Sequence, residues 1–271
     1  MGVVTSVIPV AYIVEELGGE RVRVHALVPP GASPHTFEPV PSDLRKLAQA
    51  RLFVVVGGGF DAWSDKLLGA APKGLETLTL FDAPNLKPLE GTTTITAKNR
   101  LPRRAARRKR RGRAGGGGAV DGGGSGRQGI LPEAPGRLSP EVDSVGYVRI
   151  GRELGNAKTR KYVAFHAAWP YFAERYGLEK VAVVQEFGGE EPTPREVGNL
   201  VRDARAAGVG AILVEPQLSP RVARTIAAEF GAKTVLVDPV GDPGDPARSN
   251  YEALMLFNTR AFGRALEGKR N

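Results

Sequence analysis

Two of the three histidines in this chain of 271 residues stand where a metal ligand could be held. His35 lies in Pro29–Pro39, where prolines fix their own φ and restrict the preceding residues, so this loop should be stiff and suited to holding a ligand. His166 follows the apolar run Val163–Phe165, which we predict as a strand. His25 falls within an alternating segment, and we interpret it as a surface or structural residue.

Two acidic residues end later apolar runs of the same half of the chain. Glu215 follows the run 211–214, and Asp238 follows the run 234–237. The carboxyl ends of parallel strands are where open α/β sheets bind ligands, so His166, Glu215 and Asp238 should share one edge. Imidazole and carboxylate without sulfur suit Zn²⁺ or Mn²⁺. The alternative is that these acids cap helices or bind loop amides.

Strands and helices alternate twice along the chain. We predict strands at 3–9, 21–28, 52–56, 77–80, 162–165, 181–185, 211–214 and 234–237. We predict helices at 11–17, 42–50 (with Ser42 as N-cap), 61–68, 169–176, 193–207, 220–230 and 250–266. This pattern predicts two similar α/β lobes with mostly parallel sheets and a cleft between them.

The predicted domains are an N-terminal lobe at 1–90, a basic segment at 91–154 and a C-terminal lobe at 155–271. The net charge of +9 comes from the middle segment, because Lys98–Arg113 holds ten Lys or Arg and no acid, and the remainder of the chain carries −1. The middle segment is rich in glycine and lacks apolar periodicity, so we expect it to be flexible and solvated.

Composition excludes several classes of site. The chain has no cysteine, which rules out disulfides and thiolate metal ligands. The sequence contains no run of 18 apolar residues, which is about the length that a helix needs to cross a membrane. No leader precedes the first predicted strand, so we expect that any export signal has been removed from this sequence.

The motifs resemble those of the zinc/manganese solute-binding proteins of ABC importers, the ZnuA/TroA-like family, over about 3–90 and 155–268. The resemblance is carried by five segments, which read VTSVIP at 4–9, LVPPGASPHTFEPVPSD at 27–43, YVAFHAAW at 162–169, AILVEPQLSP at 211–220 and VLVDPVG at 235–241. It implies that His35, His166 and Asp238 are metal ligands and that Glu215 is a further ligand or a supporting residue. The implied fold is two α/β lobes joined by one long helix.

The same resemblance implies a function. The chain would be a receptor, not an enzyme, that captures Zn²⁺, or alternatively Mn²⁺, and delivers it to a membrane permease. We expect a monomer, located in the periplasm or lipid-anchored at the outer face of the cytoplasmic membrane. Binding should weaken below about pH 6.5, because the imidazoles must be deprotonated.

One part of the family pattern is missing. A further histidine, in a His-x-Trp motif before the connecting helix, should fall near 95–115, where this sequence has neither residue. One hypothesis is a shifted reading frame, because threonine codons read one base early give histidine and Thr92–Ala97 would become histidine-rich. If the segment is translated as given, we expect weaker and less selective metal binding.

Two other functions remain open from the sequence. Lys98–Arg113 could bind polyanions, although no aromatic residue interleaves with its cations to stack on bases. A zinc-dependent hydrolase could use Glu215 as a general base, but no His-Glu-x-x-His or Gly-x-Ser-x-Gly motif occurs.

Overall fold

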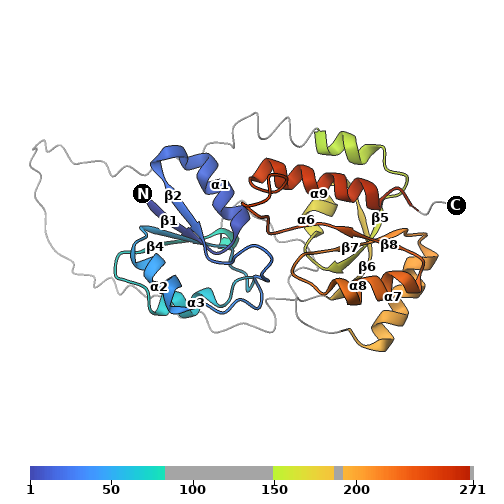
Figure 1. Cartoon of the computed structure of the whole chain (residues 1–271), viewed down its shortest axis with the longest axis horizontal. Helices are drawn as coiled ribbons and strands as arrows, with labels where there is room; N and C mark the ends of the chain where they lie inside the picture. Colours follow the sequence, from blue (N-terminus) through green and yellow to red (C-terminus); the bar gives the residue numbers. More distant parts are fainter. Residues whose placement is uncertain (83–148, 186–191, 269–271) are drawn as a thin grey trace, which may run out of the picture.

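Two lobes, each built on a four-stranded parallel sheet, make up the part of the chain that the structure describes (Figure 1). The structure is a computed structural model, and it describes residues 1–82, 149–185 and 192–268. All strand pairs in both sheets are parallel. The predicted α/β class with two similar lobes is confirmed.

The first lobe has the strand order β2-β1-β3-β4. Its elements are β1 (Gly2–Thr5), α1 (Ile8–Gly18), η1 (Gly19–Arg21), β2 (Arg23–Ala26), α2 (Pro41–Ala48), β3 (Leu52–Val55), α3 (Ser64–Gly69), β4 (Glu76–Thr79) and η2 (Leu80–Asp82). Their apolar side chains form one core that includes Val4, Phe53 and Leu47.

The second lobe has the strand order β6-β5-β7-β8. Its elements are β5 (Lys161–His166), α6 (Pro170–Tyr176), β6 (Glu179–Gln185), α7 (Pro194–Ala206), β7 (Ala211–Val214), α8 (Pro220–Glu229), β8 (Lys233–Leu236) and α9 (Tyr251–Ala265). Residues 149–155 are also helical, and they lie beside α9 in Figure 1. Their Ile150 and Leu154 pack in the core of this lobe.

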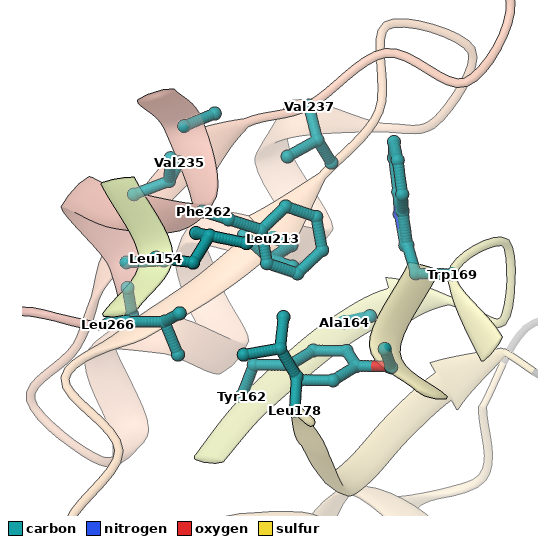
Figure 2. Close-up of a cluster of buried hydrophobic side chains, with 14 of the residues drawn as sticks. Leu154, Tyr162, Ala164, Trp169, Leu178, Leu213, Val235, Val237, Phe262 and Leu266 are labelled. Carbon is teal, nitrogen blue, oxygen red and sulfur yellow. The ribbon is translucent and has the colours of Figure 1, made fainter. Parts of the chain in front are cut away.

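Successive residues of β5 enter two different cores, because side chains alternate across a strand. Tyr162 and Ala164 face the cluster under α6 and α9, where Phe262 packs (Figure 2). Val163 and Phe165 face the cluster under α7 and α8. Burial on both faces explains the continuous apolar run of this strand and fixes the place of His166 at its end.

The two lobes touch through α1 and the segment that follows β8. Tyr12 packs against Val240 and Leu254. Its hydroxyl donates a hydrogen bond to the backbone oxygen of Arg248 at 2.7 Å. Gly241 has φ +82°, and a Cβ there would lie 3.1 Å from the Tyr12 ring, so the contact requires glycine.

Several predicted boundaries were wrong by a few residues. The first strand ends at Thr5 rather than at 9, since α1 starts at Ile8 with Pro9 in its first turn. Helix α2 starts at Pro41, so Ser42 is not its N-cap. The backbone N–H of Val40 instead donates to the side chain of Asp43 at 2.9 Å. The predicted connecting helix and the cationic run 98–113 lie outside the described residues, and the domain boundaries stay predictions.

Candidate metal centre

The His35 loop follows β2 and is held in place by Trp63. The indole N–H of Trp63 donates to the backbone oxygen of Pro34 at 2.8 Å, and this hydrogen bond is buried. The Trp63 ring also meets Phe37 edge-on, with centroids 4.7 Å apart. The backbone N–H of His35 donates to Ser33 Oγ at 3.3 Å. These contacts fix the loop on both sides of the imidazole.

A glycine turn after β3 supplies the other wall around His35. Gly57, Gly58 and Gly59 all have positive φ, which side chains other than hydrogen strongly disfavour. The buried Asp61 closes the turn by accepting the N–H groups of Val56 and Gly57 at 2.7 and 2.8 Å. The turn thereby places Phe60 edge-on to the His35 ring, with centroids 4.9 Å apart.

The His35 imidazole is neutral at physiological pH. Burial, and secondarily the proximity of His166, lower the pKa of His35 from 6.5 to about 4, against smaller opposing effects of Asp61 and the Phe60 backbone. A neutral imidazole is the form that binds a metal ion. The buried surroundings of His35 therefore favour the unprotonated ring.

His166 lies at the end of β5 and meets both His35 and Glu215. The two imidazole rings are 5.2 Å apart between centroids with planes at 71°. His166 Nδ1 lies 3.2 Å from Glu215 Oε2, and both side chains are nearly buried. This contact engages Nδ1 of the ring and leaves Nε2 on the far side from Glu215. Glu215 thus fixes the orientation of the His166 ring.

Asp238 is the most restrained of the predicted site residues. Its side chain is buried, and its Oδ1 accepts the N–H groups of Val240 and Gly241 at 2.8 and 3.0 Å. Its Oδ2 accepts from Arg248 Nη1 at 2.6 Å. The side-chain amide of Asn258 bonds both backbone groups of Asp238 at 2.7 Å each. The carboxylate therefore sits in a prepared position after β8.

The structure brings three of the four predicted site residues into direct contact and pairs the fourth with Arg248. His35, His166 and Glu215 form a continuous chain of contacts from the first lobe to the second. Asp238 is engaged with Arg248 instead. Within the described residues, no group of three or more His, Asp or Glu has the spacing to hold an ion as it stands. His25 lies on β2, where its pKa is lowered mainly by burial and by Lys46 of α2.

Sequence reasoning missed three residues of this region. Trp63 is one of them, because its indole N–H anchors the His35 loop. Asp61 was predicted only as the start of a helix, although Asp is a frequent turn residue whose side chain can bond nearby backbone N–H groups. The ion pairs of Arg248 could not be predicted from the sequence, because its acidic partners lie in a loop without apolar periodicity.

The chain matches the family model described as "Zinc-uptake complex component A periplasmic" over residues 3–99 and 148–265. It is 25% identical over 274 residues to the manganese-binding lipoprotein MntA of Halalkalibacterium halodurans, covering 96% of this chain and 86% of that protein. Among solved structures it is similar to a ZnuA, at 24% identity and TM-score 0.71, with 98% of both chains covered. It also resembles the periplasmic zinc-binding protein TroA of Treponema pallidum, at 15% identity and TM-score 0.70, with 98% of both chains covered.

Proposed function

Because this chain belongs to the family of periplasmic zinc-uptake components, we propose that it captures a divalent transition-metal ion outside the cytoplasm and delivers it to an ABC importer. The observation that carries the proposal is the edge contact between His35 of one lobe and His166 of the other, 5.2 Å between ring centroids. Zinc binds imidazole nitrogen at about 2.0–2.1 Å, so two rings this close are within reach of one ion.

The ligand set that we propose is His35 and His166, completed by Asp238, with Glu215 as the carboxylate that orients His166. The 3.2 Å contact of Glu215 to Nδ1 favours this supporting role over direct ligation through the same oxygen. The second oxygen, Oε1, is buried and without a hydrogen-bond partner among the described residues. It is thus the atom through which Glu215 could still reach an ion.

We propose zinc as the preferred ion and manganese as the alternative. The zinc preference is supported by two imidazoles at the centre, since imidazole suits zinc whereas manganese prefers oxygen ligands. Manganese is supported by the MntA relative, whose name states that it binds manganese. The ion is the cargo of this protein, so its affinity must also allow release.

We propose that the chain acts at the outer face of the cytoplasmic membrane. This location is supported by the words periplasmic and lipoprotein in the descriptions of the family and of MntA. No helix in the described ranges has the length and apolar composition needed to cross a bilayer. The partner that passes the ion on would be the membrane permease of the importer.

Titration calorimetry of the whole chain with Zn²⁺ and Mn²⁺ tests this function. We expect one ion per chain, and a loss of affinity of at least about 100-fold in His35→Ala or His166→Ala. His25→Ala is the matched control, because His25 lies on β2 beside α2, and it should bind like the wild type. A wild-type chain that takes up neither ion, or variants that bind as well as the wild type, would refute the proposal.

A further inference from the structure

Arg248 bridges the predicted ligand Asp238 and two other acids of the same segment. Its Nη1 lies 2.6 Å from Asp238 Oδ2, and its Nε and Nη2 each lie 2.8 Å from Asp245 Oδ2. Asp242 Oδ2 is 3.7 Å from Nη2. The Arg248 side chain is only 15% exposed. One cation is therefore shared by three carboxylates in a largely buried place.

The oxygen that Arg248 occupies is the one that a metal would need. Asp238 Oδ1 already accepts two backbone N–H groups, which uses both of its lone pairs. Oδ2 accepts only from Arg248 among the described residues. A dication bound to Oδ2 at about 2.0–2.2 Å would face the positive guanidinium across a single oxygen atom. The two cations therefore oppose each other at this atom.

We propose that Arg248 is a resident counter-cation of Asp238 that competes with the metal ion and thereby sets its affinity and release rate. This inference rests on the proposed metal-binding function. When a dication binds Asp238 Oδ2, the guanidinium of Arg248 can stay paired with Asp245 and Asp242. Asp245 already binds two of its nitrogens. Arg248 is thus a positioning residue, acting on the ion through Asp238.

The competition predicts opposite effects for two substitutions in one ion-pair network. Arg248→Met removes the competitor, so Zn²⁺ should bind on the order of tenfold more tightly and leave more slowly. Asp245→Asn removes the charge that draws Arg248 away from Asp238, so Zn²⁺ should bind about threefold more weakly. The asparagine keeps the Oδ1 that accepts the N–H of Ala247 at 2.9 Å, so the turn is retained.

The experiment measures Zn²⁺ affinity by calorimetry and Zn²⁺ release to a chelator by stopped flow, for the whole chain and the two variants. Arg248→Lys, which keeps the charge but loses the planar fork, should fall between the wild type and Arg248→Met, and it carries the test if the methionine variant does not fold. Tighter binding without Arg248 and weaker binding in Asp245→Asn would support the inference.

Both variants binding more weakly, or both binding like the wild type with intact circular dichroism, would show a purely structural role and overturn it. A wild-type chain that binds no Zn²⁺ would instead remove the proposed function, on which this inference depends. The two failures are therefore distinguishable in one set of titrations.

Discussion

Glu215 and His166 form the most informative contact at the scale of single residues. The carboxylate contacts Nδ1 of the ring from the end of the neighbouring strand β7. Such outer partners raise the basicity of a metal-bound imidazole and fix its orientation. The two residues should therefore act as one unit in metal binding.

Replacing Glu215 by glutamine tests this unit. The amide carries no charge and can turn its NH₂ towards Nδ1, so the orientation of His166 loses its support, and we expect Zn²⁺ affinity to fall about 10–100-fold. Glu179→Gln is the matched control, because Glu179 is exposed and begins β6 at the opposite edge of the sheet. Titration calorimetry on both variants measures the effect, and equal affinities would contradict the assignment.

His35 predicts how the stability of the protein depends on pH. Its pKa is lowered to about 4 in the folded chain against 6.5 in the unfolded chain, so the unfolded chain binds the proton more tightly. The contribution of His35 to the free energy of unfolding is therefore complete above pH 6.5. It is lost as the pH falls from 6.5 to about 4, and it changes no further below that.

Urea unfolding of the wild type and of the His35→Gln variant at pH 7.5, 5.5 and 4.5 isolates this contribution. The variant should lose less free energy of unfolding between pH 7.5 and 4.5 than the wild type does. His25 also has a lowered pKa, but it is present in both chains and cancels in the difference. Identical pH profiles for the two chains would show that His35 is not held neutral by the fold.

At the scale of elements, the capping box of α7 is a local stabilising device that the sequence already indicates. Thr193 Oγ1 accepts the N–H of Glu196, and the Glu196 carboxylate accepts the N–H of Thr193 at 2.7 Å. Both contacts satisfy N–H groups that the first helical turn leaves free. The pattern Thr-Pro-x-Glu therefore begins this helix where it was expected.

Removing this cap with Thr193→Ala should lower the free energy of unfolding by about 1 kcal/mol. Ser219→Ala is the matched control, since Ser219 is the N-cap of α8 but makes no side-chain capping bond, and it should cost only a few tenths. Chemical unfolding monitored by circular dichroism measures both. Equal losses in the two variants would contradict the assigned role of Thr193.

The elements could be predicted well from the sequence because their apolar patterns are strong. Ala211–Val214 was placed correctly at both ends, since all four residues are apolar and a glycine and an acid flank them. Helix α1 begins earlier than predicted because Ile8 was read with the strand before it. The sequence could predict that His166 and Glu215 lie close together, because each follows a strand of the same sheet. It could not predict the contact between Arg248 and Asp238, because that contact depends on how the loop after β8 folds.

At the scale of the whole molecule, the described residues join the two lobes at two places. His35 meets His166 at the carboxyl edges of the sheets, and Tyr12 meets the Arg248 backbone beside Asp238. The segment that carries Asp238 is thus tied to the first lobe.

Tyr12→Phe removes the hydrogen bond between the lobes and leaves the ring in place. The free energy of unfolding should fall by about 1 kcal/mol, because the part-buried hydrogen bond from α1 to the Arg248 carbonyl is lost. Thermal unfolding of the two chains side by side measures the difference. An unchanged midpoint would show that this contact does not help to hold the lobes together.

The central claim is tested most directly by nuclear magnetic resonance of the chain with ¹⁵N-labelled histidine, because it contains only three imidazoles. One equivalent of Zn²⁺ should shift the ring nitrogens of His35 and His166 together, with Nε2 of His166 as the bound atom, and leave His25 unchanged. Shifts confined to one of the two rings, or seen equally at His25, would contradict a single ion held between the lobes.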